Sequence, residues 1–554
     1  MTIYSTKPWL KHYRAGTPIE ITAEYDTMLE LFHGSLQRSP DGIAIKYFDG
    51  SLTMAELNEQ SDALAVALEV NGFTRADRLG LYVQNNPAFV IGLLAAWKAG
   101  GTAVAINPMN KSRELSYQLV DSGATVLLCL DELYDTVARE VITSGVTAIR
   151  MVITCSPLDY QTRNDQRVLP NTVQSQGKGS TPLPLLLKRY AGQQPTAVDI
   201  SSDEVAVITY TSGTTGVPKG AMNTHGAMAF NAQTYRDWMG ITNLDTVLGI
   251  APLFHITGLI GHIGLSLLTS APLVLTHRYH PEVMVDAIRE HRPTCTIGAI
   301  TVFLSLAGVE GVSPEDFASF RVIYSGGAAI APATNQQLKK QLGVYIHTVY
   351  GLTETNSPSH MVPFGTNAPV DSASGTLSVG LPTFNTMSRI IDENGVELPA
   401  GEIGEITIAG PQVIPGYWNK PDATAESLPG GELRTGDVGF MDETGWFYLV
   451  DRKKDMINAS GYKVWPREVE DVISGHPAVR EAAVVGVADP YRGETVKAFV
   501  ALKQGVTGVT PQDLIDFCKQ NMAAYKYPRL VELLDELPKT VTGKILRREL
   551  RDRS

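Results

Sequence analysis

The chain has 554 residues, of which 44% are hydrophobic and 19% are charged, and its formal net charge at pH 7 is -12. This length predicts more than one folded unit, and the composition is typical of globular proteins. The acidic balance argues against nucleic-acid binding, which needs a basic surface. No nucleic-acid partner is therefore expected, and anionic ligands must meet local basic residues.

The cysteines and one hydrophobic segment bear on the cellular compartment. The cysteines are widely spaced and form no C-x-x-C pair, which argues against a disulfide framework or a metal cluster; they are Cys129, Cys155, Cys295 and Cys518. The first residues lack the apolar core of a signal peptide, so the cytoplasm is expected. Residues 256–276 are nearly uncharged and long enough to span a membrane, but His262, Pro272 and several glycines favour a buried helix followed by a strand. The sequence leaves open whether the protein contacts a membrane peripherally and whether it forms a homodimer.

The N-terminal part of the chain alternates between helix and strand signals. Thr53 and Glu56 form a predicted capping box at the start of an amphipathic helix that ends at Gly72. The elements predicted next are a strand at 79–83, a helix at 89–98, a strand at 102–106, a helix from 112 and a strand at 125–130. This alternation predicts βαβ units around a mostly parallel sheet. Residues 156–200, rich in Gln, Ser, Gly and Pro, predict a loose excursion.

The stretch from Tyr210 to Gly220 has the composition of a phosphate-binding loop. It reads YTSGTTGVPKG and directly follows an apolar run. Glycines permit close backbone approach, hydroxyls and amides donate hydrogen bonds to phosphate oxygens, and a lysine supplies positive charge. The candidate ligands are Thr211, Ser212, Gly213, Thr214, Thr215, Gly216 and Lys219. A Walker P-loop is disfavoured because Pro218 and Gly220 flank the lysine, and an exposed Gly/Ser/Thr turn is the alternative.

After the loop, the predicted elements include a group of short strands near residues 389–450. The predicted strands lie at residues 294–300, 321–324, 389–391, 396–398, 405–408 and 446–450. The last four predict a β-rich subdomain at about 376–450, in which Asn394-Gly395 favours a type I′ hairpin turn. The charged link DRKKD precedes a region with its own signals, including a helix that begins at Thr510-Pro511. The expected fold is α/β, with a large domain at 1–450 and a small α+β domain at 456–554.

Several of these segments resemble one known family. The loop at 210–220, YGLTET at 350–355, DRKKD at 451–455 and PKTVTGKIL at 538–546 are similar to motifs of the adenylate-forming superfamily. Its members include acyl-CoA synthetases, luciferases and peptide-synthetase adenylation domains. The resemblance covers nearly the whole chain. It implies that the small domain moves about a hinge at 451–455, with Lys454 as the pivot.

The resemblance also implies an ATP site. Tyr350 would lie against the adenine, Thr353 near the phosphates, and Glu354 on Mg²⁺ with Thr214 as a second contact. A turn of small residues would admit the base, and a carboxylate would accept hydrogen bonds from the ribose diol. The further contacts implied in this way are Gly326, Gly327, Ala328, Gly351, Asp437 and Arg452.

Lys544 is the catalytic lysine that the resemblance implies, carried into the site by the small domain for adenylation. A basic C-terminal tail is the alternative interpretation. With Lys219 and Mg²⁺, Lys544 would neutralise charge while a carboxylate attacks the α-phosphate of ATP, which gives acyl-AMP and pyrophosphate. A carboxylic acid is already ionised at neutral pH, so this step needs no general base.

His255, in the segment PLFHITG, bears on the substrate. Peptide-synthetase adenylation domains keep an aspartate at this place for an α-ammonium group, so a carboxylic acid without that group is favoured. The acyl pocket implied by the resemblance and by apolar residues nearby consists of His225, His255, Gly258, Val302 and Phe303. Together with Gly261 and Gly264, Gly258 is expected to leave room beside this pocket.

The segment SGYKVWP resembles that of thioester-forming members, which places Gly461, Tyr462 and Lys463 on the CoA side. No carrier-protein domain is expected after Ser554, so CoA is the expected acceptor. The hypothesis is a two-step acyl-CoA synthetase for medium- or long-chain fatty acids that uses ATP, Mg²⁺ and coenzyme A. The alternatives are a CoA ligase for aryl, terpenoid or steroid side-chain acids, an acyl-AMP ligase that loads a carrier protein, and a catalytically silent nucleotide or acyl-CoA sensor.

Overall fold

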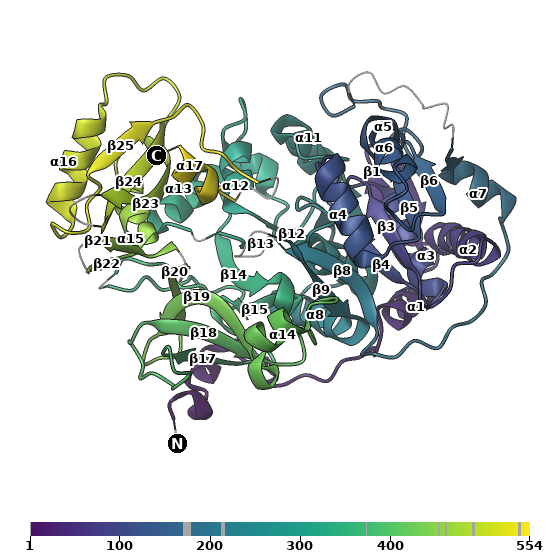
Figure 1. The fold of residues 1–554 in the computed structure, drawn as a ribbon, viewed down its shortest axis with the longest axis horizontal. Coiled ribbons are helices and arrows are strands. Elements are labelled where there is room, and N and C mark those ends of the chain that lie inside the picture. The colour runs from purple at the N-terminus through teal and green to yellow at the C-terminus, as the bar shows by residue number, and fades with distance from the viewer. Residues whose placement is uncertain are drawn as a thin grey trace.

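The computed structural model describes residues 2–169, 179–211, 217–328, 330–372, 374–452, 455–459, 462–489, 493–540 and 544–553. For residues 452, 462, 463 and 493 only the backbone is described. Figure 1 shows two sheets among helices in the purple to teal part of the chain, a green sheet beside the N-terminus, and a yellow unit that holds the C-terminus. The predicted α/β fold class is confirmed.

The first sheet is parallel except at one edge, with strand order β7-β6-β5-β3-β4-β8-β9. Its strands are β3 (Arg78–Tyr82), β4 (Thr102–Ala105), β5 (Val126–Leu130), β6 (Met151–Cys155), β7 (Thr181–Pro182), β8 (Val205–Thr211) and β9 (Lys219–Thr224). The helices of this part are α2 (Met54–Val70), α3 (Pro87–Lys98), α4 (Ser112–Ser122), α5 (Asp131–Leu133), α6 (Arg139–Thr143) and α7 (Leu183–Arg189). The predicted βαβ alternation is therefore correct.

Local signals explain where these helices begin. The capping box predicted for α2 is present, because Thr53 Oγ1 accepts a hydrogen bond from the Glu56 amide and the Glu56 carboxylate accepts one from the Thr53 amide. Helix α3 begins after Asn86, whose side chain accepts from the Phe89 amide. Every residue of α3 is buried, and even Lys98 is enclosed, its ammonium 2.6 Å from Asp62. This helix therefore lies inside the protein.

The second sheet is parallel in its centre and antiparallel at both edges, with order β16-β15-β14-β13-β12-β10-β11-β1-β2. Its strands are β1 (Ile43–Tyr47), β2 (Gly50–Thr53), β10 (Val247–Leu248), β11 (Leu273–Leu275), β12 (Cys295–Gly298), β13 (Val322–Ser325), β14 (Ile346–Leu352), β15 (Ser357–Met361) and β16 (Leu381–Pro382). Its helices are α1 (Met28–Arg38), α8 (His225–Met239), α9 (Ile256–Gly258), α10 (Leu265–Thr269), α11 (Pro281–His291), α12 (Ile300–Ala307) and α13 (Pro332–Leu342). A single buried hydrophobic cluster joins both sheets through helices such as α2, α3 and α8.

The structure confirms the prediction for residues 256–276 and corrects part of the prediction for residues 156–200. Residues 256–276 form short helical segments followed by β11, as expected. Within the described ranges, no helix is both long and apolar enough to cross a membrane. The loose excursion predicted at 156–200 is wrong for residues 181–189, because β7 joins the first sheet and α7 buries Leu183 and Leu186.

The β-rich part is an antiparallel sheet of order β17-β18-β19-β20. Its elements are β17 (Met387–Ile391), β18 (Gly404–Ala409), α14 (Pro421–Ser427), β19 (Leu433–Met441) and β20 (Phe447–Arg452). The predicted type I′ turn is wrong, because only Gly395 of the Asn394-Gly395 pair has a positive φ, at 82°. The Asp392 carboxylate accepts hydrogen bonds from the amides of Asn394 and Val396, which stabilises a different turn.

The C-terminal unit combines a mixed sheet with helices. Its strands are β21 (Ile457–Ala459), β22 (Tyr462–Val464), β23 (Val479–Asp489), β24 (Gly493–Leu502) and β25 (Leu530–Leu533), and its helices are α15 (Pro466–Ser474), α16 (Pro511–Asn521) and α17 (Arg547–Asp552). Helix α16 begins at the predicted Thr510 cap and buries Leu514 and Cys518. The boundaries at 450 and 456 and the hinge between them stay predictions.

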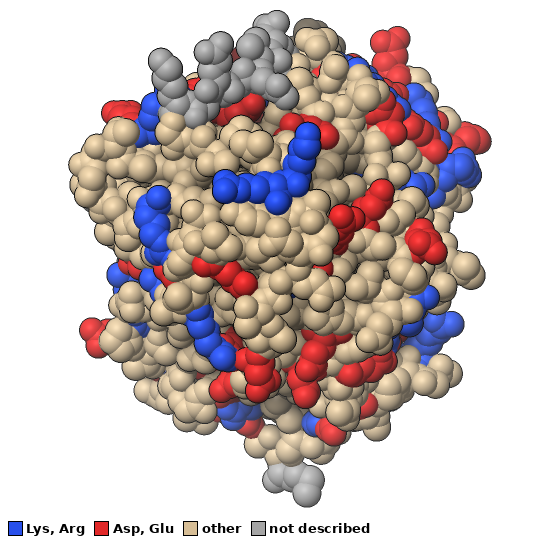
Figure 2. All heavy atoms as spheres, turned by 90° about the vertical axis from the view of Figure 1, so that its right-hand side faces the viewer, with Lys and Arg blue, Asp and Glu red and all other residues tan. Residues whose placement is uncertain are grey.

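The surface carries charges of both signs. Figure 2, which views the right-hand side of Figure 1, shows basic and acidic side chains interspersed across this face.

Candidate active site

The described ends of the predicted phosphate loop lie on strands β8 and β9. Thr211 pairs with Lys219 at the end of the two strands. From α4, the Tyr117 hydroxyl donates a hydrogen bond to the carbonyl oxygen of Pro218 at 2.7 Å, so the residue before Lys219 is fixed from outside the hairpin. Ser212, Gly213, Thr214, Thr215 and Gly216 lie outside the described residues. The described ends of the loop place Lys219 at the edge of the first sheet.

Lys219 and Glu354 meet through a tyrosine that the sequence analysis missed. The Lys219 ammonium lies over the Tyr417 ring, 5.1 Å from its centroid. The Tyr417 hydroxyl donates a hydrogen bond to Oε1 of Glu354 at 2.8 Å. Burial and the Glu354 carboxylate raise the pKa of Tyr417, so this hydroxyl stays a donor at neutral pH. The only sequence signal was an aromatic residue between Gly416 and Trp418, which is also typical of a core position.

The YGLTET segment runs from the end of β14 into a short turn. Gly351 is required here, because a Cβ atom at this position would lie 2.0 Å from the carbonyl oxygen of Ser357. The carbonyl oxygen of Thr353 accepts a hydrogen bond from the side-chain amide of Asn223, on β9. On α8, Asn231 donates to the carbonyl oxygens that follow Glu354. These amides hold the candidate metal ligand against the hairpin that carries Lys219.

Tyr350 and Asp437 are in direct contact, because the Tyr350 hydroxyl donates to Oδ2 of Asp437 at 2.8 Å. Thr435, Gly436 and Asp437 form a bulge inside β19, where Gly436 has a φ of 69°. Thr435 Oγ1 closes this bulge by donating to Ile406 and accepting from the Asp437 amide. A bulge in a paired strand fixes the direction in which this carboxylate points. On β20, Arg452 is the backbone partner of Asp437.

The adenine-side turn follows β13, where Gly326 passes close to the carbonyl oxygen of Val349, the residue before Tyr350. A Cβ atom at Gly326 would lie 2.7 Å from this oxygen, so the turn can lie against β14 only with glycine here. Gly327 has a φ of 78° and open space around it, and Ala328 is exposed. The turn therefore presents small groups to a ligand beside Tyr350.

Lys544 lies within electrostatic reach of His255. His255 is partly buried and caps α9, with Nδ1 accepting from the Thr257 amide at 3.3 Å. Burial, and then the Lys544 ammonium, lower the pKa of His255 to about 4, so the ring is neutral at pH 7. The backbone of Lys544 is held by Thr540, which donates its amide to the Lys544 carbonyl oxygen at 2.7 Å. The charge of this lysine of the C-terminal unit therefore acts on one of the residues predicted for the acyl pocket.

Two other acyl-pocket predictions need correction. His225 begins α8 beside Glu204, at the opposite end of β9 from Lys219, and packs edge-on against the Trp97 ring at 5.4 Å. His225 is 2% exposed, so it occupies a core position against this ring. Gly258 does not leave room either, because a Cβ atom there would lie 2.1 Å from the carbonyl oxygen of Pro252.

The other small and apolar residues near the pocket pack closely. Added Cβ atoms at Gly261 and Gly264 would meet Ile297 and Ala232, so close packing explains these glycines as well. Phe303 is buried on α12 with its ring against Gly298, whereas Val302 is only partly buried.

Several predicted residues cannot be placed. Lys454 and Gly461 lie outside the described residues, and only the backbone is described for Arg452, Tyr462 and Lys463.

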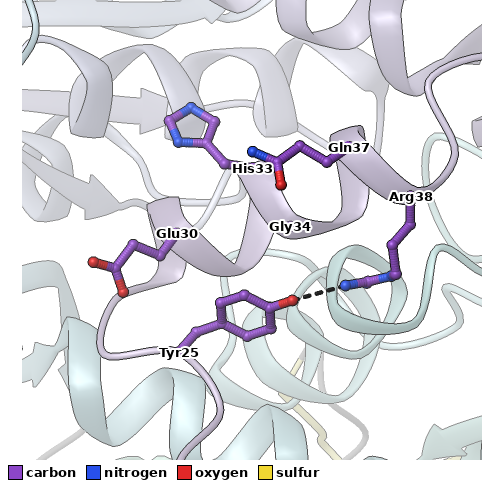
Figure 3. A pocket seen from close by; sticks show the side chains of 6 residues that line it. All are labelled: Tyr25, Glu30, His33, Gly34, Gln37 and Arg38. Carbon is purple, nitrogen blue, oxygen red and sulfur yellow. Dashed lines mark hydrogen bonds between the residues drawn. The ribbon is translucent and has the colours of Figure 1, made fainter.

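A depression of about 520 Å³ lies elsewhere, on α1 (Figure 3). Its lining residues are Tyr25, Glu30, His33, Gly34, Gln37 and Arg38. Arg38 donates to the Tyr25 hydroxyl at 2.8 Å, and the Tyr25 ring lies over Gly34, where a side chain would collide with it. None of the predicted site residues lines this depression.

The groups around Tyr350 and Lys219 fit an adenine nucleotide with Mg²⁺. One end offers an aromatic ring and a carboxylate, and the other offers an ammonium group and a second carboxylate, which are complementary to a base with its ribose and to metal-bound phosphates. Mg²⁺ takes one or two protein carboxylates and otherwise phosphate oxygens and water, so Glu354 suffices as an anchor.

Comparison with known families agrees with this geometry. Residues 32–418 match the family described as AMP-binding enzyme, and residues 468–544 match the AMP-binding enzyme C-terminal domain. The chain belongs to the AMP-binding enzyme family. The predicted adenylate-forming superfamily is confirmed. The C-terminal match ends at Lys544, and the first match ends one residue after Tyr417.

Among family members, the long-chain-fatty-acid–CoA ligase of Bacillus subtilis is 36% identical over 99% of this chain and 98% of that protein. The ligase of the same description from Escherichia coli O157:H7 is 34% identical with the same coverage. A feruloyl-CoA synthase from Amycolatopsis is 34% identical over 93% of this chain and 96% of its own length.

Solved structures of the family also resemble the fold. The anthranilate CoA ligase AuaEII in complex with anthranoyl-AMP has a TM-score of 0.85 and 26% identity, and covers 97% of this chain and 98% of its own. ATP-bound MatB from Rhodopseudomonas palustris has a TM-score of 0.83 and 28% identity, with coverage of 95% and 98%.

Proposed function

We propose that the chain is an AMP-forming acid–thiol ligase that activates fatty acids with ATP and transfers the acyl group to CoA. The observation that supports this most directly is the buried contact between Tyr350 and Asp437, in which the Tyr350 hydroxyl donates to the Asp437 carboxylate at 2.8 Å. The Tyr350–Asp437 pair and the Lys219–Tyr417–Glu354 group offer partners for the two ends of ATP. Its relatives of nearly equal length are named as long-chain-fatty-acid–CoA ligases.

In the first half-reaction, the ionised carboxylate of the fatty acid attacks the α-phosphate of ATP and pyrophosphate leaves. Lys544 would hold the two reacting anions together, which offsets their repulsion as the new bond forms. Lys219 would hold the leaving phosphates at the hairpin tip. Glu354 would hold Mg²⁺, which would supply positive charge against the phosphates. Asp437 would orient the ribose, and the attacking carboxylate needs no base.

In the second half-reaction, the thiolate of CoA attacks the carbonyl carbon of acyl-AMP and AMP leaves. The residues proposed for the CoA side are Gly461, Tyr462 and Lys463. We propose that the C-terminal unit turns about residues 451–455, with Lys454 as the pivot, between the two half-reactions. Because ATP and CoA are both required, the cytoplasm is the proposed compartment.

His255 supports a substrate without an α-ammonium group. The ring is neutral at pH 7 and lies near a lysine, so the site offers no negative charge at this position to pair with an ammonium group. The feruloyl-CoA synthase and anthranilate ligase relatives make aryl acids the second candidate class.

A panel of carboxylic acids, scored by AMP release with Mg²⁺ and CoA, tests the substrate class. Dodecanoate and palmitate should give the highest kcat/KM. Preference for ferulate or anthranilate over every fatty acid would replace the fatty-acid proposal with the aryl one.

A further inference from the structure

Tyr417 bridges two groups that the proposed function uses separately. Its hydroxyl is bound to Oε1 of Glu354 at 2.8 Å, and its ring lies under the Lys219 ammonium. An ammonium group is attracted to the face of an aromatic ring, and a hydroxyl donor fixes the orientation of the carboxylate that it binds. The two contacts therefore orient a cation and an anion with one side chain.

The backbone around Tyr417 is tied to both partners. The Trp418 amide donates to the carbonyl oxygen of Gly220, the residue after Lys219, at 2.8 Å, and the Met222 amide donates to the Gly416 carbonyl oxygen at 3.1 Å. Ahead of Tyr417, the Ile414 amide donates to the carbonyl oxygen of Glu354 at 2.9 Å. The segment 414–418 thus connects the edge of β9 to the turn that carries Glu354.

The conformation of this segment leaves Tyr417 little freedom. Tyr417 is 7% exposed, and its amide donates to Thr424 Oγ1 at 2.9 Å. Gly416 has a φ of 158° and packs against Thr424, where a Cβ atom would lie 2.6 Å from the threonine methyl carbon. The ring and hydroxyl of Tyr417 are therefore held in place before any ligand binds.

We propose that Tyr417 is a positioning residue for Mg–ATP, which acts by orienting the Glu354 carboxylate through its hydroxyl and the Lys219 ammonium through its ring. This inference rests on the proposed function, because it assigns the same phosphates to Lys219 and the same metal to Glu354. The hydroxyl and the ring have separable effects: the hydroxyl acts on the metal requirement, and the ring acts on phosphate affinity even without metal.

The first test removes the hydroxyl alone. For Tyr417→Phe, we expect the Mg²⁺ concentration that half-saturates its enhancement of ATP binding to rise about tenfold, since partners of metal-binding carboxylates typically affect metal affinity by 10- to 100-fold. ATP binding without Mg²⁺ should be unchanged. The readout is equilibrium binding of ATP by calorimetry in the absence of acid and CoA.

A double-mutant cycle with Glu354→Gln tests whether the hydroxyl acts through Glu354. Adding Tyr417→Phe to Glu354→Gln should change the Mg²⁺ requirement less than twofold, because the charged acceptor is already gone. A full tenfold effect in both backgrounds would overturn the assignment. An unchanged Mg²⁺ requirement in Tyr417→Phe alone would also overturn it.

Tyr417→Leu tests the ring. Compared with Tyr417→Phe, it should weaken Mg²⁺-free ATP binding about threefold or more, and this difference should vanish in a Lys219→Ala background. Equal binding by the two variants would overturn the role of the ring. If Tyr417→Leu does not fold, replacement of Tyr417 by cyclohexylalanine tests the same contact with a side chain of nearly the same volume. Weaker Mg²⁺-free ATP binding than in Tyr417→Phe would support the role of the ring, and equal binding would overturn it.

The matched control is Tyr448→Phe, which removes a tyrosine hydroxyl that donates to another carboxylate, Oδ2 of Asp442, at 3.1 Å. It should change neither the Mg²⁺ concentration for half-saturation nor the affinity for ATP without Mg²⁺. The midpoint of thermal unfolding without nucleotide should be similar for Tyr417→Phe and Tyr448→Phe. If the unchanged chain binds no ATP, the proposed function fails and takes this inference with it. If it binds ATP and responds to Mg²⁺ but Tyr417→Phe matches it, this inference alone fails.

Discussion

The hydroxyl of Tyr350 donates a hydrogen bond to Asp437 at 2.8 Å, although the two residues lie 87 positions apart on different sheets. Tyr350 lies near the end of β14 in the second sheet, and Asp437 lies in the bulge of β19. A buried hydrogen bond to a carboxylate fixes the direction of both side chains. The contact therefore holds the proposed base platform and the proposed ribose acceptor in one geometry before ATP binds.

The first prediction concerns ribose recognition. The unchanged chain should bind ATP at least about tenfold more tightly than an ATP analogue that lacks both ribose hydroxyls, because hydrogen bonds to a charged acceptor are worth about 1.5–3 kcal/mol. Asp437→Ala should bind the two nucleotides equally. Tyr350→Phe should lose part of the preference, since Asp437 is then less firmly oriented. An Asp437→Ala variant that keeps the full preference would show that the ribose is bound elsewhere.

The second prediction concerns Lys544. Lys544→Ala should slow formation of acyl-AMP from ATP and palmitate by 100-fold or more, as loss of a charge-stabilising group at a reacting centre does. Conversion of supplied palmitoyl-AMP and CoA to the thioester should change by less than about fivefold. Single-turnover kinetics measure both steps. The control is Lys539→Ala, in the same segment, whose ammonium pairs with Glu481 at 2.7 Å. Equal losses in both half-reactions would contradict the proposed domain rotation.

The third prediction concerns the anchor of the Lys544 segment. Arg547 contacts Asp451 at 3.2 Å and Asp455 at 3.4 Å, and it binds both carboxylate oxygens of Glu470. Arg547→Leu removes the cation that these three acids share, although Arg551 still pairs with Asp455. It should lower the free energy of unfolding of the C-terminal unit by about 3–5 kcal/mol. The exposed neighbour gives a control, Arg548→Leu, which should change it by less than about 0.5 kcal/mol. Hydrogen exchange of β23 and β24 during denaturant titration measures both values.

The fourth prediction concerns pH. His262 is fully buried, and its Nε2 accepts a hydrogen bond from the Ala251 amide at 3.1 Å. Burial lowers the pKa of His262 from 6.5 to about 4, so the unfolded chain takes up a proton in this range and the folded chain does not. The free energy of unfolding should therefore be highest above pH 6.5 and fall as the pH drops toward 4, by about 3 kcal/mol from this residue.

Replacement of this histidine checks the fourth prediction. His262→Gln should show a shallower fall between pH 6.5 and 4 in urea titrations, because glutamine binds no proton in either state. The remaining slope would come from other buried histidines, such as His277 and His360, whose pKa values burial also lowers. Identical slopes for His262→Gln and the unchanged chain would contradict the assignment.

Local signals predicted the elements of the fold better than their irregular details. The capping residues Thr53 and Thr510 begin the predicted helices, because a cap is a contact between residues close in sequence. The turn at Asn394 was mispredicted because the Asp392 side chain, two residues earlier, outweighs the preference of Asn-Gly for a type I′ turn. The bulge at Gly436 depends on pairing with β18, which the local sequence does not contain.

The candidate site shows the same limit. Residues proposed to touch a ligand, such as Lys219 and Glu354, lie in motifs of unusual composition. Tyr417 acts on those residues across the fold, and its neighbours in the sequence do not distinguish it from a core aromatic residue. Gly258 and His225 were misplaced for a related reason: whether a small or titratable residue faces a ligand or the core depends on packing by distant segments.

The products formed from palmitate test the account most directly. Incubation of the chain with radiolabelled ATP, Mg²⁺, CoA and palmitate should yield AMP and palmitoyl-CoA in equal amounts, with pyrophosphate released in the first step. Without CoA, palmitoyl-AMP should accumulate to about one equivalent of enzyme. Release of ADP and phosphate, or the absence of AMP formation with every carboxylic acid in the panel, would contradict the account.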